Sequence, residues 1–443
     1  MTGRIHYPRP DGDSEAGPAV ERAILVAVPR PDGGKSSARE HLAELERLAD
    51  TAGAEVVGEI VQILDAPRAR YYLGSGKARK LAEMVGAKEA ELVVFDDELT
   101  PAQARNLEKL CGVRVLDRTE LILDIFATRA RSYEARLQVE LAQLQYLLPR
   151  LRRMWVHLSR IRGGIGLRGP GETQLEVDKR LIGRRIADLR RKLAAVSRAE
   201  ATRRKGRADS FRATLVGYTN TGKSSLLQAL SGKEQNVEDR LFATLDASTR
   251  LVDLGDRREA LVTDTVGFIR KLPHHLVASF RSTLAEAREA DLLLHVVDAS
   301  HPQRDVQAGV VRATLAEMGL ADRAVLTVYN KVDLLGDEEM MALRALADPG
   351  GEGRAIYTSA LAPATLEPLR SALRRRARER WRKVRVWLPV AEGGVLASLY
   401  EGGDVLSRTE DGSTVTVVAR ASRALIGRLR AHAGVRVAEW PGR

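Results

Sequence analysis

Short apolar runs alternate with amphipathic stretches in the first third of the chain. The apolar runs are rich in Val, Ile and Leu, which predicts strands, and they lie at 23–29, 54–64, 91–95 and 113–117. Apolar residues recur at helical spacing between them, which predicts helices at 38–52, 76–86, 101–110 and 118–128. The alternation predicts an N-terminal α/β domain over 21–128 with a largely parallel sheet. The polar, Pro- and Gly-rich residues 1–20 predict a disordered tail.

A different periodicity follows. Leucines recur at alternating spacings of four and three, at Leu137, Leu141, Leu144, Leu148 and Leu151. A second apolar series lies at Leu175, Ile182, Ile186, Leu189, Leu193 and Val196. Each series places one apolar stripe on a helix, and two such helices close in sequence predict an antiparallel helical hairpin over 129–209. Thr173 and Glu176 have the spacing of a capping box that opens the second helix.

The tip of this hairpin, at about 160–171, is rich in glycine and arginine. Its candidate RNA-contacting residues are Arg160, Arg162, Gly163, Gly164, Gly166, Arg168, Gly169 and Gly171. Glycine adds nothing to a core but lets backbone approach another surface closely, and arginine can pair with phosphates or stack on bases. The alternative is a merely flexible connection between the two helices.

The strand and helix alternation returns over 210–376 and predicts a second α/β domain with a mostly parallel, doubly wound sheet. A basic linker is predicted at 377–383. The last segment, 384–443, has the order βαββαβ, which is typical of a small α+β domain of the ferredoxin-like kind.

Positive charge is concentrated in the predicted hairpin. The whole chain carries a net charge of +12, and residues 150–212 alone hold 19 basic and six acidic residues. Such an excess indicates either a polyanion-binding surface or a solvated helix face. No apolar run reaches the roughly 18 residues of a membrane span, and the N-terminus lacks the hydrophobic segment of a secretion signal. The single cysteine, Cys111, excludes an intrachain disulfide, and these features together predict a cytoplasmic protein.

The strongest chemical signal is GYTNTGKSS, which lies between an apolar strand and a helical pattern. It matches the phosphate-binding loop G-x-x-x-x-G-K-[ST] in the context that this motif requires. Backbone N–H groups of such a loop cradle phosphates, Lys223 reaches the β- and γ-phosphates, and the Ser224 hydroxyl binds Mg²⁺. The predicted nucleotide-binding residues of the loop are Gly217, Tyr218, Thr219, Asn220, Thr221, Gly222, Lys223, Ser224 and Ser225.

Two later segments predict contacts to the γ-phosphate. DTVGF ends an apolar strand, so that Asp264 can hold the Mg²⁺ shell and Gly267 can bring a backbone N–H to the phosphate. Thr244 lies in the long loop before that strand and is a switch candidate that contacts Mg²⁺ and the γ-phosphate in the triphosphate state. The predicted catalytic residues are therefore Lys223, Thr244 and Gly267, and the predicted metal ligands are Ser224 and Thr244.

NKVD and TSA predict recognition of guanine. The Asp333 carboxylate can accept hydrogen bonds from guanine N1–H and from its N2 amine, neither of which adenine offers. Asn330 can steady the loop, the Lys331 stem can cover the ring, and the Ala360 N–H, which follows Ser359, can bond guanine O6. Each motif alone is also an ordinary strand-end turn, but their order after the phosphate loop favours a guanine nucleotide site.

The four motifs in this order resemble the translation-factor-related GTPases. LGSGKARKL, FDDELTPAQARNLE and especially GGIGLRGPGETQLEVDKRLIGRRI narrow the resemblance to the HflX family of ribosome-binding GTPases, over about 23–375. The resemblance implies GTP hydrolysis, binding of the large ribosomal subunit and its rRNA, and splitting of stalled or idle 70S ribosomes. It also implies that the glycine-rich tip approaches the peptidyl-transferase region. We expect a monomer that binds GTP or GDP with Mg²⁺.

Two other functions fit the same residues. One is a GTP-gated assembly or stress factor that binds the large subunit without splitting ribosomes, and the other is an RNA-binding module whose slow hydrolysis serves as a timer. Phe268 stands where Ras-like enzymes carry a water-orienting glutamine, so water must be positioned in another way or by a partner. Residues 74–77, GSGK, lack the spacing of a phosphate loop and predict a turn at a helix start instead.

Overall fold

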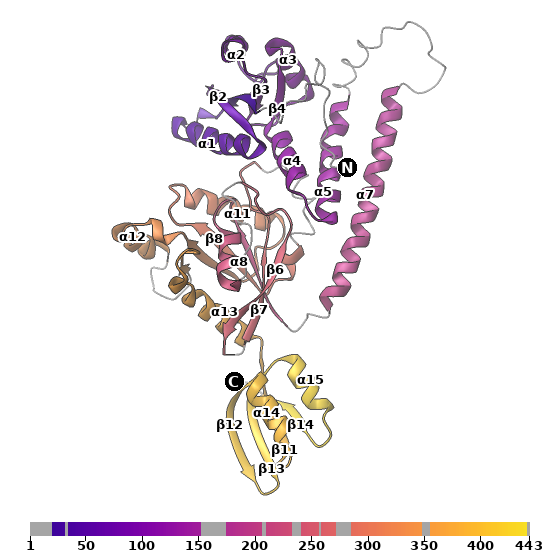
Figure 1. Cartoon of the computed structure of the whole chain (residues 1–443), viewed down its shortest axis with the longest axis vertical. Helices are drawn as coiled ribbons and strands as arrows, with labels where there is room; N and C mark the ends of the chain where they lie inside the picture. The colour runs from indigo at the N-terminus through magenta and orange to yellow at the C-terminus, as the bar shows by residue number, and fades with distance from the viewer. Residues whose placement is uncertain are drawn as a thin grey trace. The chain divides into compact units, whose positions relative to one another are not determined.

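The computed structural model describes residues 20–31, 34–151, 174–205, 210–232, 241–256, 258–271, 285–347 and 355–440. The chain divides into two compact units (Figure 1). The first comprises Met1–Ala199 with Glu238–Asp246 and Arg270–Ser282, and the second comprises Glu200–Val237, Ala247–Ile269 and Thr283–Arg443. Two short segments of the predicted second α/β domain therefore belong to the unit of the N-terminal domain.

The N-terminal domain is the predicted parallel α/β sheet. Its strands pair in the order β2-β1-β3-β4 and have the bounds Glu21–Ala27 for β1, Ala54–Val61 for β2, Leu92–Phe95 for β3 and Arg114–Asp117 for β4. The helices are α1 Gly34–Ala52, α2 Ser75–Lys88, α3 Pro101–Cys111 and α4 Arg118–Arg129. Gly74 is the N-cap of α2, which confirms a helix start at GSGK. Strands β1, β3 and β4 are largely buried on both faces, as is usual for a parallel sheet, whereas the edge strand β2 is mostly half-buried.

The helical hairpin is present as α5, Tyr133–Leu147, and α7, Gln174–Lys205. Leu137 and Leu141 form one buried cluster with Ile186 and Leu189, so the two predicted stripes pack against each other. A bidentate ion pair between Arg185 and Glu140, with N–O distances of 2.7 and 2.9 Å, adds a polar contact beside the cluster. After Leu147 the first helix tightens into a 3-10 turn, Leu148–Arg150, where Pro149 cannot donate a backbone hydrogen bond.

Several predictions on the hairpin lie outside the described residues. The glycine-rich tip at 160–171 and Thr173 of the predicted capping box are among them. The tip contacts therefore remain predictions from the sequence.

The second α/β domain has the predicted doubly wound sheet, in the order β10-β9-β8-β5-β7-β6. Its strands are β5 Phe211–Gly217, β6 Ser248–Gly255, β7 Arg258–Asp264, β8 Leu292–Asp298, β9 Val325–Asn330 and β10 Ala355–Tyr357. All pairings are parallel except that of β6 with β7. Its helices are α8 Lys223–Ser231, α10 Ala285–Glu289, α11 Arg304–Glu317, α12 Asp337–Ala347 and α13 Glu367–Glu379, with 3-10 turns at Val332–Leu334 and Pro363–Leu366.

The packing of this domain places the four sequence motifs at one edge of its sheet. Leucines of α8 and α13 share one buried cluster with the strands, and α11 contacts β5 and β8. The parallel strands all end at the same edge of the sheet, where the loops after β5, β7, β8, β9 and β10 meet. The four sequence motifs occupy four of these loops.

The C-terminal domain has the predicted βαββαβ order and an antiparallel sheet. Its elements are β11 Arg382–Pro389, α14 Gly393–Gly402, β12 Gly403–Asp411, β13 Thr414–Ala421, α15 Arg423–Ala431 and β14 Arg436–Glu439. The sheet order is β12-β13-β11-β14, with the first and last strands of the domain paired at one end. The hairpin turn after β12 uses Gly412 at φ +59°.

The predicted basic linker at 377–383 is wrong. Helix α13 continues to Glu379 and strand β11 begins at Arg382, so only Arg380 and Trp381 connect them. The reason is that the arginines lie on the polar side of an amphipathic helix whose apolar side, with Leu373 and Ala377, is buried in the domain core.

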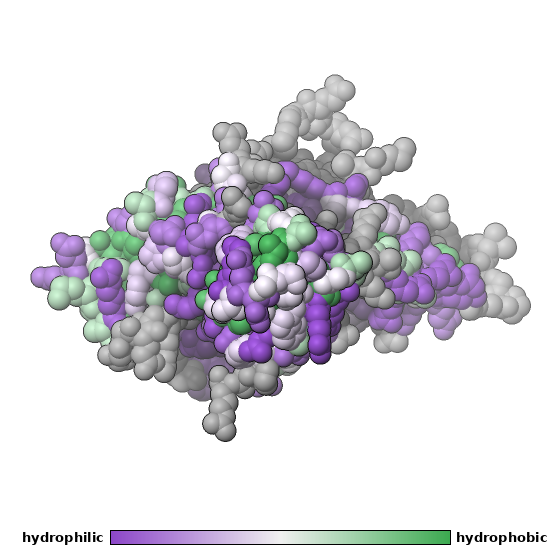
Figure 2. Space-filling view, turned by 90° about the horizontal axis from the view of Figure 1, so that it is seen from below, coloured by the Kyte–Doolittle hydropathy of each residue, from purple (hydrophilic) through white to green (hydrophobic). Residues whose placement is uncertain are grey.

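Charged and polar residues dominate the face of the molecule shown in Figure 2, with apolar residues gathered in small patches between them. Among the described helices, none combines the length and the apolar character that a membrane crossing needs.

Candidate functional site

The phosphate loop runs from the end of β5 to the start of α8. Gly222 is the N-cap of α8 and has a φ of +83°, a conformation that favours glycine. A Cβ at this position would lie 2.4 Å from Nδ2 of Asn330, so no other residue fits without displacing that side chain. Thr221 closes the loop by donating its hydroxyl to the Tyr218 carbonyl at 3.0 Å. The loop is thus shaped by its own side chains and by the neighbouring strand end.

Lys223 is buried, and its ammonium group lies inside the loop. Its Nζ donates to the carbonyl oxygens of Tyr218 at 2.7 Å and of Gly217 at 3.3 Å. Burial lowers the pKa of Lys223 to about 8, and the Asp264 carboxylate partly opposes this shift. A buried cation held by carbonyl oxygens can be attracted by phosphate oxygens, which offer a full negative charge.

Ser224 and Asp264 come together at the other side of the loop. The Ser224 hydroxyl donates to Oδ2 of Asp264 at 2.6 Å, although the two residues are far apart in the sequence. A hydroxyl and a carboxylate are oxygen donors of the kind that Mg²⁺ prefers, and Mg²⁺ usually completes its shell with water and phosphate. The described residues contain no cluster of three or more His, Cys, Asp or Glu side chains with metal-binding geometry.

The segment after β7 presses its backbone against the phosphate loop. Phe268 makes two backbone hydrogen bonds with the loop. Its N–H donates to the Gly217 carbonyl at 3.0 Å, and its carbonyl accepts from the Thr219 N–H at 2.7 Å. A Cβ at Gly267 would lie 2.8 Å from the Thr219 Cα, so glycine is required for this approach. The Phe268 side chain is only 3% exposed, and a phenyl ring has no hydrogen-bonding group with which to orient water.

Asn330 ties the base-recognition loops to the phosphate loop. Its Nδ2 donates to the Thr221 carbonyl at 2.9 Å, and its Oδ1 accepts from the Ala360 N–H at 3.1 Å. The sequence analysis predicts that this N–H bonds guanine O6, whereas the structure gives it to Asn330 because the amide side chain lies between the two loops. The base contact of Ala360 therefore remains a prediction.

Lys331 and Asp333 occupy the turn after β9. Lys331 has a φ of +62°, and its Nζ donates to the Asn220 carbonyl at 2.9 Å and pairs with Asp298 at 2.6 Å. Asp298 ends β8, and the sequence analysis missed it because only the pairing of β8 with β9 brings the two residues together. Asp333 is exposed, and Ser359 is buried beside Asn330.

Thr244 lies in the first compact unit, whereas the phosphate loop lies in the second. Phe242, near Thr244 in the same segment, packs edge-on against Phe126 of α4, with ring centroids 4.7 Å apart. Asp246 accepts hydrogen bonds from the backbone N–H groups of Arg131 at 3.1 Å and Ser132 at 3.0 Å. Ser132 is the N-cap of α5, so the segment of Thr244 is fixed to the root of the helical hairpin. The predicted contact of Thr244 with Mg²⁺ remains a prediction.

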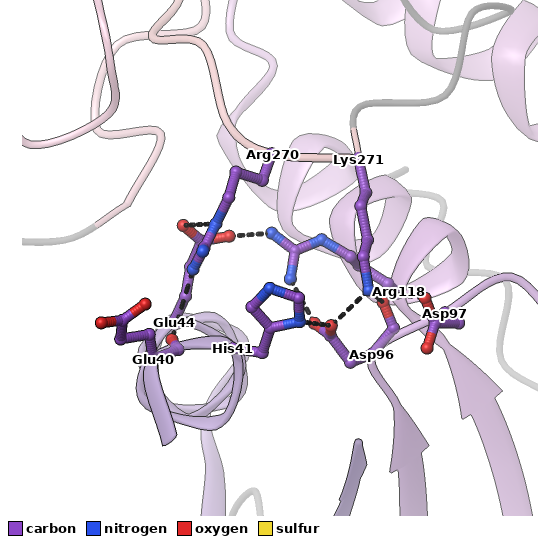
Figure 3. A network of polar contacts seen from close by, with 8 residues as sticks. All are labelled: Glu40, His41, Glu44, Asp96, Asp97, Arg118, Arg270 and Lys271. Atoms are coloured by element: carbon purple, nitrogen blue, oxygen red, sulfur yellow. Dashed lines mark hydrogen bonds and ion pairs between the residues drawn. The ribbon is translucent and has the colours of Figure 1, made fainter. Parts of the chain in front are cut away.

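The segment that follows Phe268 is fixed to the same unit by a network of ions (Figure 3). Lys271 pairs with Asp96 at 2.6 Å and with Asp97, and Arg270 pairs with Glu44 at 3.4 Å. Arg118 lies between these carboxylates and pairs with Asp96 at 2.6 Å and with Glu44. Neither Arg270 nor Lys271 was singled out from the sequence, because their partners lie in a distant part of the chain.

Asp96 is the centre of this network. Its side chain is 1% exposed, and His41 contacts it at 3.2 Å in addition to the two cations. Burial alone would disfavour its charge, but the hydrogen bond from His41 and the charges of Arg118 and Lys271 hold its pKa well below the usual range. A fully ionised, buried carboxylate with several partners makes a specific attachment point, because removing any partner leaves charge uncompensated.

Three family models match successive parts of the chain. Residues 39–127 match the model described as GTP-binding GTPase N-terminal, and residues 129–207 match GTP-binding GTPase Middle Region. Residues 212–331 match the model described as 50S ribosome-binding GTPase. These ranges follow the N-terminal domain, the hairpin and the domain with the phosphate loop.

Curated relatives cover nearly the whole chain. The GTPase HflX of Caldanaerobacter subterraneus is 45% identical over 93% of this chain and 93% of its own length. The GTPase HflX of Escherichia coli is 45% identical over 86% of this chain and 89% of its own length. A solved structure of SsGBP in complex with GDP aligns over 81% of this chain and 99% of its own length, with 25% identity and a TM-score of 0.46. The chain is thus a GTPase and belongs to the HflX family.

Proposed function

We propose that this GTPase binds the large ribosomal subunit and dissociates stalled or idle 70S ribosomes. The observation that carries the proposal is the attachment of two segments, the one that contains Thr244 and the one that follows Phe268, to the unit with the hairpin. Asp246 is bonded to the N-cap of α5, and Lys271 is paired with the buried Asp96. Both attachments lie in the unit that carries the basic hairpin. A nucleotide that moves the segment of Asp246 therefore acts on the root of the hairpin, and one that moves the segment of Lys271 acts on the N-terminal sheet. The family description of residues 212–331 supports the large subunit as the partner.

The proposed roles in GTP hydrolysis combine the sequence motifs with the contacts of the phosphate loop. Lys223 neutralises the β- and γ-phosphates, Gly267 presents its N–H to the γ-phosphate, and Thr244 joins them when its segment closes. Ser224 and Thr244 are the proposed Mg²⁺ ligands, and Asp264 orients Ser224 through the 2.6 Å hydrogen bond. Bound Mg²⁺ supplies charge neutralisation on the phosphate oxygens.

Sucrose gradients of purified 70S ribosomes test the proposal. With GTP or a non-hydrolysable analogue, the protein should convert 70S particles to 50S and 30S subunits, and with GDP it should not. Persistence of the 70S peak with bound protein would contradict splitting and favour an assembly or stress factor. Failure to pellet with 50S particles, together with retained RNA binding, would favour a nucleotide-timed RNA-binding module.

A variant of Asp246 tests the observation that carries the proposal. Asp246→Ala removes the acceptor for two backbone N–H groups at the root of α5, so it should retain GTP binding but lose most splitting activity. The control is Asp322→Ala, which removes an exposed carboxylate from a turn elsewhere in the chain. Equal splitting by the two variants would show that this attachment does not transmit the nucleotide state.

Intrinsic hydrolysis should be slow and should rise at least about tenfold with 50S subunits, because Phe268 cannot orient the attacking water and a partner must do so. Phosphate release measured alone, with 50S and with 30S subunits checks this expectation. Equal rates in all three would indicate a site that is complete without the ribosome.

Asp333→Asn should reverse the base preference from guanine toward xanthine. The carboxylate accepts from the guanine N2 amine, whereas an amide can donate to the oxygen that xanthine carries there, and loss of such a pair is expected to cost about tenfold or more in affinity. Titration with GTP and xanthosine triphosphate measures the change. An unaltered preference for GTP would remove Asp333 from the base site.

A further inference from the structure

The C-terminal sheet has one face covered by helices and one face that carries aromatic and basic side chains. Val384, Val386 and Leu388 of β11 point into the core with α14 and α15. The alternate residues of the same strand, Lys383, Arg385 and Trp387, therefore lie on the opposite face. Within the described residues of this domain, both helices contribute to the same core cluster, and no helix covers the opposite face.

The neighbouring strand β14 completes this face. Trp387 is paired with Arg436, Arg385 with Ala438, and the Trp440 N–H donates to the Lys383 carbonyl at 2.9 Å. Trp387 and Trp440 thus lie on the same face as the three basic side chains. Both tryptophans are half-buried, and Lys383 and Arg436 are exposed.

These five side chains alternate cation and ring. The Lys383 Nζ lies 4.9 Å from the Trp440 ring centre, and the Arg385 guanidinium lies 4.0 Å from the same ring. Arg385 also lies 5.8 Å from the Trp387 ring, whose other cation is Arg436 at 5.4 Å. We call the set Lys383, Trp440, Arg385, Trp387 and Arg436 the Trp–Arg ladder. It spans about 13 Å along β11 at the usual rise of a strand.

The charge around the ladder is positive. Residues 382–443 contain ten Lys or Arg and six Asp or Glu. Glu439, the acidic residue of β14, pairs with Arg382, and both lie at register positions of the helix-covered face. Asp404 lies on the same face, opposite Arg420, but its carboxylate is paired with Arg258 and Arg378. The ladder itself contains three cations and no carboxylate, which favours an anionic partner with flat groups that can stack.

We propose that the Trp–Arg ladder is a binding site for single-stranded RNA. Indole rings and guanidinium planes stack on unpaired bases, and lysine and arginine pair with the phosphates between them. An open face of a four-stranded sheet with two aromatic rings offers places for two or three bases. Duplex RNA hides its bases, so it cannot use the rings. The proposal concerns the C-terminal domain and does not depend on ribosome splitting.

The test uses the full-length protein and a fluorescein-labelled 12-nucleotide single-stranded RNA. Trp387→Ala combined with Trp440→Ala should weaken binding about tenfold or more, since each base stacked on an aromatic ring contributes on that order. Trp387→Phe combined with Trp440→Phe keeps two stacking rings and should retain most of the affinity. Tyr400→Ala is the matched control, because it removes an exposed aromatic ring from α14 on the helix-covered side of the same domain.

Two further readouts separate the ladder from the basic hairpin, which also attracts RNA. Ultraviolet cross-links should map to 383–387 and 436–440 in the wild type and disappear from there in the double alanine variant. Arg385→Gln should reduce the salt dependence of binding by about one phosphate contact.

Equal affinity of the double alanine variant and of Tyr400→Ala would overturn the proposal. Cross-links confined to 129–207 would also overturn it, and the ladder would then be a surface for another kind of partner.

Discussion

Lys223→Ala should lower the affinity for GTP by about a hundredfold or more. The side chain offers a charged donor to two phosphates, and hydrogen bonds to charged groups contribute about 1.5–3 kcal/mol each. Two such contacts correspond to a factor of about one hundred or more in the dissociation constant. Its Nζ lies inside the loop, 2.7 Å from the Tyr218 carbonyl, where it can approach bound phosphates.

The same change should leave the free energy of unfolding without nucleotide nearly unaltered. Burial lowers the pKa of Lys223 to about 8, because desolvation disfavours the charged form of the amine. Removing the ammonium group therefore relieves a desolvation cost while it removes two hydrogen bonds to the loop, and the two effects oppose each other. Loss of affinity will thus report on phosphate contacts and not on unfolding.

Isothermal titration with GTP and GDP, together with thermal unfolding, measures both expectations. Lys88→Ala is the control, because it removes an exposed lysine from the end of α2 and should change neither quantity. Wild-type affinity and turnover in Lys223→Ala would contradict the assignment of the phosphate loop. A large fall in the unfolding temperature without nucleotide would instead give Lys223 a structural role.

The elements of all three α/β and α+β domains follow from local patterns in the sequence. The β-strand at 91–95 was predicted from a run of apolar residues and occurs at Leu92–Phe95, and the stripes at Leu137 and Leu189 pack together as expected. Such patterns depend on which face of an element is buried, and burial repeats with the period of the element itself. The prediction of a linker at 377–383 is wrong because the dense run of arginines makes the helical spacing of the few apolar residues hard to recognise in the sequence.

The contacts that connect distant parts of the chain could not be predicted in this way. The pairing of Lys271 with Asp96 joins residues 175 positions apart, and that of Lys331 with Asp298 requires β8 beside β9. The Trp–Arg ladder depends on the register of β11 against β14. A sequence shows that each residue carries charge or a ring, but only the fold decides which of them meet.

Replacement of the hairpin tip should abolish ribosome splitting. Exchanging 163–171 for a short Ser/Gly turn removes five glycines and Arg168 while it keeps both helices. We call the paired helices α5 and α7 the stalk. The stalk is stabilised by contacts away from the tip, in the cluster of Leu137, Leu141, Ile186 and Leu189 and in the ion pair of Arg185 with Glu140. Folding and GTP binding should therefore remain at wild-type levels, because neither the stalk contacts nor the phosphate loop change.

Binding to the ribosome should weaken only in part. The remaining basic residues of the stalk still attract phosphates, and such attraction is additive and salt-dependent. Four measurements on the same variant distinguish folding, GTP binding, ribosome binding and splitting. They are thermal unfolding, GTP titration, pelleting with 50S subunits and sucrose gradients of 70S particles. We expect normal unfolding, normal titration, reduced pelleting and an intact 70S peak.

A second variant separates the backbone of the tip from its charge. Changing Arg160, Arg162 and Arg168 to glutamine keeps every glycine and removes three cations. If the glycine backbone must enter a crowded RNA surface, this variant should split ribosomes at reduced efficiency and with a shallower salt dependence, whereas the turn replacement should not split them at any salt concentration. Efficient splitting by the turn replacement would make the tip a passive connection, and the work of dissociation would then fall to the stalk and to the segments attached at Ser132 and Asp96.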